Sequence, residues 1–312
     1  MDISYLLFLQ DFRHAIHDAW TPFLEGASLF SVTYLLLLPV FIYWCIDKRK
    51  GLFTLYAMCL CVAVNAVTKL TACVYRPWIR DPRILPAGDS ITTATGYSFP
   101  SGHTATAAPI YGGMAVGFWD KKSTRWLSVL CIVALLITGF SRNYLGVHTP
   151  QDVGVGFILG ILSLLAADWI LKHPQHENKV LIGGFLCCVA ALFYITYKPY
   201  PLDYVNGKLL VDPQRMMNDG YKDIGALAAF FLARYTEKRW IGFQATGFTL
   251  KGVILTVVGL VGLGLLIAHL QDPFVAWLGR HWGRLVARAI IIFYVVALYP
   301  LIIKWLNRTK HA

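Results

Sequence analysis

Apolar runs of membrane-spanning length recur along this chain of 312 residues, separated by shorter polar segments. A helix needs roughly 20 predominantly apolar residues to cross the hydrocarbon core of a bilayer. On this criterion we expect an all-α polytopic membrane protein with about nine membrane helices. The predicted helices span residues 29–46, 51–71, 102–119, 125–140, 150–171, 179–197, 221–236, 250–269 and 285–304.

Two parts of the chain lack a clear membrane-helix pattern. In segment 221–236 the strictly apolar stretch covers only 224–233, although Tyr235 and Trp240 could anchor the helix at the membrane interface. Residues 1–29 contain acidic and aromatic side chains and have no basic start followed by an apolar core. The sequence therefore predicts no cleavable signal peptide.

The composition agrees with a membrane protein that forms one domain. Hydrophobic residues make up 57% of the chain and charged residues 14%, whereas soluble globular proteins carry about 25% charged residues. Mean hydropathy is +0.56. No internal repeat or low-complexity linker divides the chain, so we expect a single membrane domain over 1–312. Within it, residues 51–171 form a motif-bearing core and residues 172–312 add further membrane helices.

The net charge of +11 could indicate a nucleic acid or another anionic partner. In a membrane protein, however, Lys and Arg gather in the cytoplasmic loops. Short basic clusters at 47–50 and 120–125 mark that side, whereas the first 29 residues carry Asp2, Asp11 and Asp18. We therefore expect a plasma-membrane protein with an extracytoplasmic N-terminus, a cytoplasmic C-terminus and no nucleic-acid partner.

The cysteines do not indicate a disulfide framework or a metal site. All seven lie in or beside apolar runs, and Cys187 and Cys188 are adjacent. Neither a repeated CxxC pattern nor an HExxH pattern occurs, so the sequence predicts no zinc site.

Three polar segments, each next to the end of a predicted helix, hold most of the polar residues that need an explanation. The first lies at the end of the second helix, the second immediately before the third helix, and the third at the start of the fifth. With the predicted spans, all three emerge on one face of the membrane. They contain Lys69, Arg76 and Pro77; Pro100, Ser101, Gly102 and His103; and Ser141, Arg142, His148 and Asp152.

Each of these residues also has an ordinary structural interpretation. Lys69, near a helix end, could extend its ammonium group to the membrane interface. Ser101 is a typical N-cap. Thr149, Pro150 and Asp152 together form a good helix start, with the acidic residue near the positive end of the helix dipole. Taken singly, these residues leave structure and function open.

Taken together, the three segments fit phosphoryl transfer, in which negative charge spreads over three equatorial oxygens in the transition state. Lys69, Arg76 and Arg142 supply three cations, and the two arginines can bind phosphate through bidentate donors. Ser101 and Gly102 open a helix, and free backbone N–H groups at a helix N-terminus bind anions.

Two histidines can divide the acid–base work. His148 must attack as a neutral imidazole and form a phosphohistidine. Asp152 lies four residues later, about one helical turn on, so it can accept from one ring nitrogen and leave the other nucleophilic. His103 can donate a proton to the leaving oxygen and then activate the water that hydrolyses the intermediate.

These three spacings resemble a known family signature. The patterns KxxxxxxRP at 69–77, PSGH at 100–103 and SRxxxxxHxxxD at 141–152 are similar to the complete signature of the type-2 phosphatidic acid phosphatase superfamily. All three parts occur in order. The resemblance covers residues 51–171, and 172–312 match only as generic membrane helices.

The resemblance assigns a role to each candidate residue. It implies that His148 is the nucleophile, that His103 is the acid and that Asp152 orients the nucleophile. It also implies catalysis without a metal ion or other cofactor. The implied phosphate-binding residues are Lys69, Arg76, Ser101, Gly102 and Arg142.

The bilayer and a lipid phosphate are the partners that this reasoning favours. Similar bacterial proteins imply hydrolysis of a monoester or diphosphate such as an isoprenyl diphosphate, phosphatidylglycerol phosphate or phosphatidic acid. The nine-helix layout is also similar to that of glucose-6-phosphatases, so a soluble sugar phosphate is an alternative. Transfer of phosphate to another acceptor and non-enzymatic transport of a phosphate or lipid are further alternatives.

Two features outside the motifs could contact the substrate. The polar segment 198–220 could overhang the site and select the head group, or it could be a solvated connector. Arg80 and Arg83, beside the first motif, could contact a second phosphate.

Overall fold

The computed structural model describes residues 2–308, and helices make up nearly all of its regular structure. Seven helical segments within this range are long and apolar enough to cross a membrane. The prediction of an all-α polytopic membrane fold is therefore confirmed. The main elements are α2 (Thr21–Thr33), α3 (Leu37–Phe41), η1 (Ile42–Ile46), α4 (Lys48–Ala72), α8 (Arg125–Tyr144), α9 (Pro150–Lys172), α10 (Pro174–Tyr197), α12 (Leu250–His269), α13 (Gln271–Phe293), η4 (Tyr294–Leu298) and α14 (Tyr299–Arg308).

The predicted count of nine membrane helices is not confirmed. The third and seventh predicted segments form helices α7 (Gly102–Trp119) and α11 (Pro213–Thr236), but neither is among the seven apolar segments. Both lie among other helices: α7 packs against α4, α8 and α9, and α11 packs against α4, α10 and α13. A helix enclosed by protein can carry polar residues that a lipid-facing helix cannot.

Several predicted helix ends are displaced. The first membrane segment begins at Thr21 rather than at 29, and the last begins at Gln271 rather than at 285. Within α13 the helix is interrupted at Gly279, where φ is 78°. In both segments the missed part combines polar and aromatic residues, so hydropathy did not detect it.

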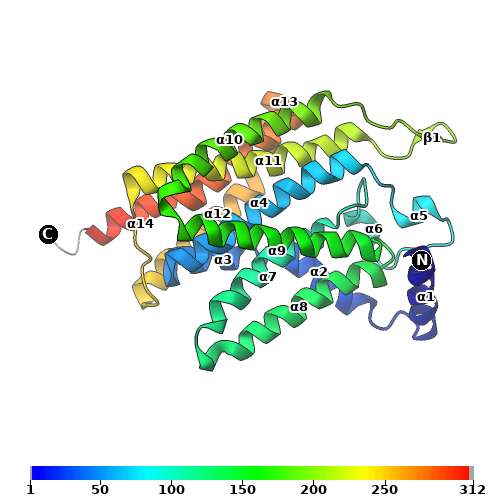
Figure 1. The fold of residues 1–312 in the computed structure, drawn as a ribbon, viewed down its shortest axis with the longest axis horizontal. Helices are drawn as coiled ribbons and strands as arrows, with labels where there is room; N and C mark the ends of the chain where they lie inside the picture. Colours follow the sequence, from blue (N-terminus) through cyan, green and yellow to red (C-terminus); the bar gives the residue numbers. More distant parts are fainter. Residues whose placement is uncertain (1, 309–312) are drawn as a thin grey trace.

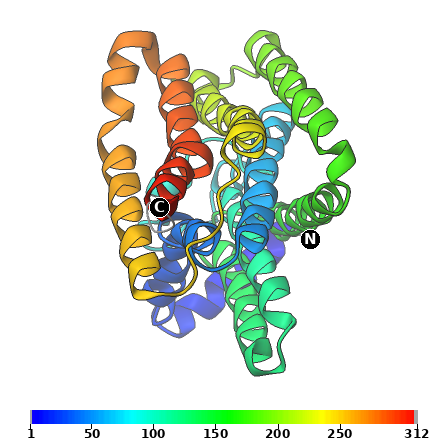
Figure 2. The ribbon, with the colours of Figure 1, turned by 90° about the vertical axis from the view of Figure 1, so that its left-hand side faces the viewer.

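The largest of three hydrophobic clusters among the described residues joins the two halves of the chain. Tyr56 of α4 stacks edge-on against Phe230 of α11, with ring centroids 4.6 Å apart. The indole N–H of Trp44 donates to the carbonyl of Val295 at 2.8 Å. Figure 2 shows α4 in the interior of the bundle, with helices of both halves around it. The C-terminal helices are therefore packed onto the motif-bearing helices.

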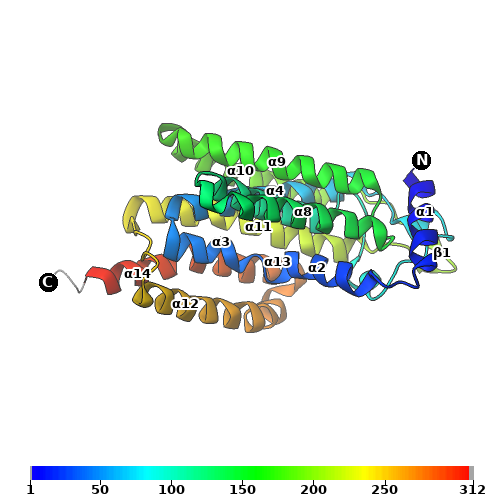
Figure 3. The same ribbon diagram turned by 90° about the horizontal axis from the view of Figure 1, so that it is seen from below.

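The first and last described helices, α1 and α14, lie at opposite ends of the bundle (Figure 1). Helix α1 (Asp2–Ala15) lies across one end, as Figures 1 and 3 show. Its Arg13 is buried and donates to the carbonyls of Leu85 at 2.8 Å and Tyr144 at 3.4 Å. This end also carries the short helices α5 (Pro77–Arg80) and α6 (Ser90–Thr93) and a hairpin of β1 (Tyr204–Val205) with β2 (Lys208–Leu209). The predicted cytoplasmic C-terminus, at 309–312, lies outside the described residues.

A buried ion-pair cluster, here called the paired cluster, joins α4, α10 and α11 at the other end of these helices. Glu237, in the helical turn η3 (Glu237–Ile241), is fully buried and pairs with Lys48 at 2.6 Å and with Arg234. Glu177 pairs with Arg234 and with Lys238, each at 2.8 Å. Each carboxylate therefore contacts two cations.

Candidate functional site

The three motif segments meet around a cavity of about 230 Å³ at the end of the bundle that α1 covers. Of the eight candidate site residues, Lys69, Arg76, Gly102, His103 and His148 line this cavity. The other three, Ser101, Arg142 and Asp152, are buried behind them. The remaining lining residues are Val32, Asn65, Ala66, Leu70, Thr93, Thr95, Thr106, Met216, Asp219, Gly220, Lys222 and Asp223.

Asp152 serves as both a helix cap and a partner of His148. Thr149 and Asp152 form a reciprocal capping box at the start of α9. One carboxylate oxygen, Oδ2, accepts from the backbone N–H of Thr149 at 2.8 Å and from the hydroxyl of Ser98 at 2.5 Å. The same oxygen lies 3.3 Å from Nδ1 of His148. The structural and the functional interpretation of Asp152 are therefore compatible.

The other ring nitrogen of His148, Nε2, lies 2.9 Å from Nη1 of Arg76. A guanidinium group can only donate hydrogen bonds, so Nε2 is the acceptor and carries a lone pair. Nδ1 then holds the proton and faces Asp152. This is the neutral tautomer that a nucleophilic imidazole requires.

His148 lies in the connection between α8 and α9 and is 1% exposed. Burial, followed by the charges of Arg76, Lys69 and Arg142, lowers the pKa of this imidazole well below its usual value of 6.5. Asn143 fixes the backbone next to the ring by donating to the carbonyl of His148 at 2.9 Å. The ring is therefore held neutral and in place.

Two of the three predicted cations are held by the backbone. Arg76 donates to the carbonyls of Gly96, Val147 and Thr95 at 2.9–3.1 Å. The ammonium group of Lys69 donates to the carbonyls of Tyr97, Ser98 and Pro100 at 2.6–3.1 Å. These contacts fix the loop that precedes α7 and keep both positive charges at the wall of the cavity.

Arg142 is the least satisfied of the three cations. It is 1% exposed, and its Nη1 donates to the hydroxyl of Ser28 at 3.0 Å. Its Nε and Nη2 are buried and have no hydrogen-bond partner among the described residues. Buried polar groups normally have partners, and an unsatisfied charged group is costly. Arg142 therefore has donors to spare for an anion or a bridging water.

The start of α7 places His103 and Gly102 on the cavity wall. Ser101 caps this helix: its hydroxyl accepts from the backbone N–H of Thr104 at 3.4 Å. The first N–H groups of a helix lack intrahelical partners and favour anions. Nε2 of His103 is buried and has no hydrogen-bond partner in the described part of the chain. A Cβ on Gly102 would meet only Asn65, at 4.0 Å, so this backbone faces open space.

The sequence analysis missed several residues at the site. Ser98 and Asn143 hold Asp152 and His148, and α11 places Asp219, Lys222 and Asp223 on the cavity wall. No spacing pattern in the sequence relates these residues to the motifs. The three α11 residues could have been noticed as charges that interrupt an apolar pattern, which membrane helices retain mainly at functional sites.

The sequence analysis also predicted substrate contacts outside the motifs, from Arg80 and Arg83 and from segment 198–220, and the structure places these residues differently. Arg80 pairs with Asp2, and Arg83 pairs with Asp81; neither arginine lines the cavity. Part of segment 198–220 does line it, because α11 begins at Pro213 and presents Met216, Asp219 and Gly220. Whether this segment selects the head group stays a prediction.

The arrangement can hold and attack a phosphoryl group. It combines a neutral imidazole whose Nε2 carries a lone pair, a second imidazole, two cations and a helix N-terminus at the cavity wall, with Arg142 buried behind them. Among residues 2–308, no group of three or more His, Cys, Asp or Glu side chains is arranged to hold a metal ion.

Comparison with known proteins adds independent information. A family model described as the PAP2 superfamily matches residues 50–175. Bacitracin transport permease protein BcrC of Bacillus licheniformis is 32% identical over 152 residues, which cover 47% of this chain and 70% of the relative. Phosphatidylglycerophosphatase B of Escherichia coli is 34% identical over 93 residues, or 27% of this chain and 36% of the relative.

A longer alignment relates the chain to a eukaryotic protein. A dihydrosphingosine 1-phosphate phosphatase of Schizosaccharomyces pombe is 30% identical over 212 residues, covering 62% of this chain and 48% of the relative. The chain thus spans about a third of the E. coli relative and about half of the S. pombe relative. No solved structure matches the chain.

Proposed function

Because the chain belongs to the PAP2 superfamily and two of the relatives above are named as phosphatases, we propose that it hydrolyses a membrane lipid phosphate or diphosphate without a metal ion. The observation that carries this proposal is the His148 geometry. Nδ1 faces Asp152 at 3.3 Å, and the lone pair on Nε2 lies at the cavity wall beside Arg76.

The first step is attack by Nε2 of His148 on the phosphorus, which forms a phosphohistidine. In the structure Arg76 donates to Nε2, so this arginine must move its donor from the imidazole to a phosphoryl oxygen when the substrate binds. The ring becomes positively charged as the P–N bond forms, and Asp152 stabilises that charge through the proton on Nδ1.

The leaving oxygen takes a proton from His103, whose Nε2 has no other partner. His103 then accepts a proton from the water that attacks the phosphohistidine, which releases orthophosphate. Arg142, Lys69 and the N–H groups at the start of α7 offset the charge on the phosphoryl oxygens. Ser101 contributes by capping α7 and so placing those N–H groups.

A lipid substrate is supported by the membrane fold and by the names of the relatives. Two of the relatives are named as phosphatases for phosphatidylglycerol phosphate and dihydrosphingosine 1-phosphate. The cavity around His148 lies in a bundle that contains, within residues 2–308, seven segments long and apolar enough to cross a membrane. A lipid head group can reach this cavity while its chain stays among the helices.

The direct test is phosphate release by the purified chain in detergent with EDTA present. The substrate panel is phosphatidic acid, phosphatidylglycerol phosphate, farnesyl diphosphate, sphingosine phosphate and glucose 6-phosphate. We expect release from at least one lipid, and loss of that release in His148→Ala but not in His176→Ala, an exposed histidine outside the site. Release from glucose 6-phosphate alone would replace the lipid proposal with the soluble one. Activity that survives His148→Ala would refute the mechanism.

We also propose that the N-terminus and the cavity face the extracytoplasmic side of the plasma membrane and that the C-terminus is cytoplasmic. The exposed residues Asn206, in the hairpin, and Lys122, between α7 and α8, provide test positions. In intact cells, with the exposed Cys187 changed to Ser, a membrane-impermeant maleimide should label Asn206→Cys but not Lys122→Cys. The reverse labelling would invert the topology.

A further inference from the structure

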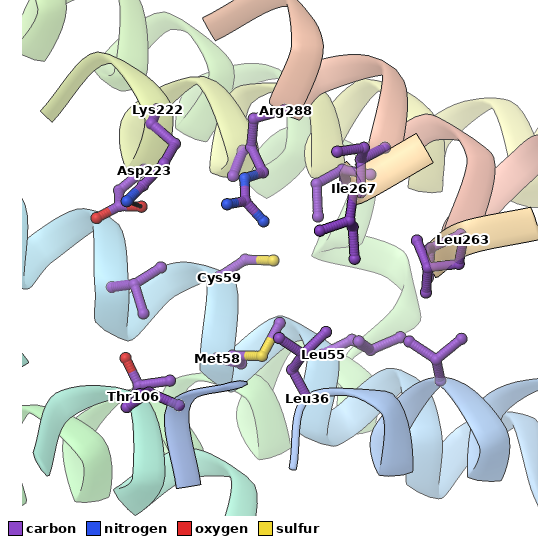
Figure 4. Close-up of a pocket in the computed structure, with 17 residues that line it drawn as sticks. Leu36, Leu55, Met58, Cys59, Thr106, Lys222, Asp223, Leu263, Ile267 and Arg288 are labelled. Carbon is purple, nitrogen blue, oxygen red and sulfur yellow. Dashed lines mark ion pairs between the residues drawn. The ribbon is translucent and has the colours of Figure 1, made fainter. Parts of the chain in front are cut away.

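A second cavity, of about 280 Å³, lies between the motif-bearing helices and the C-terminal helices. Figure 4 shows its apolar side chains from α3, α4 and α12, including Leu36 just before α3, Leu55, Met58, Leu263 and Ile267. We call this cavity the apolar chamber. Such a chamber suits a hydrocarbon chain and not a free sugar phosphate.

The apolar chamber adjoins the cavity around His148 described above, here called the phosphate cavity. Four residues line both: Val32, Thr106, Lys222 and Asp223. We call this shared boundary the neck. A molecule with a phosphoryl group beside His148 and a chain in the chamber must therefore pass Lys222 and Asp223.

The charged groups in and beside the neck differ in how many partners they have. Lys222 lies 3.2 Å from Asp219 and 3.7 Å from Asp223, and Arg284 lies 3.3 Å from Asp219. Arg288 also lines the chamber, yet among the described residues it donates no hydrogen bond and forms no ion pair. Asp223 is an opposite charge that acts on it at longer range. In Figure 4 the Arg288 guanidinium points toward Cys59, into the chamber.

A half-buried guanidinium group that points into a largely apolar cavity and has no hydrogen-bond partner there favours an anionic ligand. In and beside the neck, two carboxylates, Asp219 and Asp223, face three cations, Lys222, Arg284 and Arg288, so the group has one positive charge in excess. The ligand group at this point should therefore carry negative charge. In a lipid diphosphate, the phosphoryl group that bears the chain lies between the outer phosphoryl group and the apolar chain.

We propose that Arg288 and Lys222 bind the chain-bearing phosphoryl group of a lipid diphosphate and give the enzyme its preference for diphosphates over monophosphates. This inference rests on the proposed function of the His148 site. The outer phosphoryl group lies beside His148, and the first part of the chain occupies the apolar chamber. Both residues lie outside 50–175, the segment that matches the family model, so the preference is a property of the C-terminal helices.

The chemical step balances with this placement. Nε2 of His148 bonds to the outer phosphorus, and the bond from that phosphorus to the bridging oxygen breaks. The electron pair remains on the bridging oxygen, which takes the proton of His103 and becomes a hydroxyl oxygen of the departing lipid monophosphate. Arg288 and Lys222 stabilise the added charge on this leaving group. Water then cleaves the phosphohistidine, gives its proton to His103 and releases orthophosphate.

The test compares farnesyl diphosphate with farnesyl monophosphate, using the full chain in detergent. In Arg288→Gln we expect kcat/KM for the diphosphate to fall about tenfold to hundredfold, the range for losing a hydrogen bond to a charged group, with the monophosphate nearly unchanged. Arg288→Lys should recover part of the preference. The matched control is Arg280→Gln, an exposed arginine on the same helix that lines neither cavity.

The outcomes separate this inference from the proposed function. If Arg288→Gln leaves the diphosphate-to-monophosphate ratio unchanged while both substrates still depend on His148, the inference is wrong and the function stands. If neither farnesyl substrate is hydrolysed while another lipid of the panel is, the inference is wrong and the function stands; if hydrolysis survives His148→Ala, the proposed function fails first. Selective loss of sphingosine phosphate hydrolysis in Asp223→Asn, with the farnesyl ratio unaltered in Arg288→Gln, would assign the neck to an ammonium group.

A second arm tests the chamber itself. Leu263, 1% exposed, lines the chamber, whereas Leu265 on the same helix is 57% exposed. Leu263→Trp should raise KM for farnesyl diphosphate several-fold and leave hydrolysis of isopentenyl diphosphate, with its short chain, nearly unchanged. Leu265→Trp should change neither value. Equal effects of Leu263→Trp on both substrates would exclude the chamber as the chain site.

Discussion

Two clusters of charged side chains lie near opposite ends of α4, and they differ in how their charges are satisfied. In the paired cluster, near Lys48, Glu237 and Glu177 each contact two cations. At the cavity around His148, near Lys69, Arg142 behind the wall has two buried nitrogens and His103 has one for which residues 2–308 offer no hydrogen-bond partner. Both clusters are buried in a membrane bundle, so burial alone does not distinguish structural from functional charge.

The difference in how completely the charged groups are paired indicates what each cluster does. A fully paired buried cluster holds elements together, and removing one member leaves an uncompensated charge. A cluster with unpaired charges lowers the stability of the ligand-free protein, and a bound ligand can supply the missing partners. We therefore expect substitutions in the paired cluster to lower stability, and substitutions in the cavity to lower activity.

The largest expected loss of activity comes from Asp152→Asn. An amide would place an N–H group against Nδ1 of His148 and favour the tautomer with the proton on Nε2, which has no lone pair for attack. We expect kcat to fall by about 10⁴, as in a serine-protease triad with the equivalent change. Ser98→Ala, which removes one donor to the same carboxylate, should lower kcat far less. Equal losses in both variants would indicate that the whole loop had been disturbed.

The next largest effect is a loss of stability in Glu237→Gln. The change leaves Lys48 and Arg234 without a full counter-charge at a site that is 0% exposed. We expect the free energy of unfolding to fall by about 3–5 kcal/mol. Thermal unfolding in detergent measures this, and kcat at a temperature where both proteins are folded should be unchanged. A catalytic loss with unaltered stability would reverse the assignment of this cluster.

Arg142→Gln should give the opposite result. One lost charged donor to the phosphoryl group typically costs about 10²–10³ in kcat. Stability should be unchanged or higher, because two unsatisfied buried donors are removed. Inorganic phosphate should raise the unfolding temperature of the wild-type protein and raise that of Arg142→Gln less. Destabilisation as large as that in Glu237→Gln would show that Arg142 is part of the scaffold.

Local signals in the sequence predicted the two helices that position several of the candidate site residues. The segments predicted at 102–119 and 150–171 became α7 and α9 with almost the same ends. Their first turns are set by Ser101 and by Thr149 with Asp152, and such caps act over three or four residues. Hydropathy was less informative for α11, because this enclosed helix need not be apolar.

The network around the site was not visible in the sequence. Ser98 and Asp152 are 54 positions apart and meet only because α7 packs against α9. Arg288 lies 140 positions after His148, on a helix that the motif pattern did not include. Contacts of this kind depend on tertiary packing, and a single sequence records no trace of them.

The smallest expected effect is a pH dependence of stability that originates at His148. Its pKa is held well below 6.5 in the folded chain, by burial and by the charges of Arg76, Lys69 and Arg142. As pH falls below about 6.5, the imidazole of His148 binds a proton in the unfolded chain but not in the folded chain. The free energy of unfolding therefore decreases with acidification.

Between pH 7 and pH 5 the wild-type protein should therefore lose about 2 kcal/mol more than His148→Gln, which cannot titrate. Unfolding in detergent at pH 5, 6, 7 and 8 measures both slopes. Parallel curves would mean that the imidazole is freely protonated in the fold, and that the cavity cations do not act on it as the geometry requires. A steeper wild-type curve would show that the cations around His148 lower the stability of the protein at acidic pH. The paired cluster, in which each carboxylate contacts two cations, has no such effect.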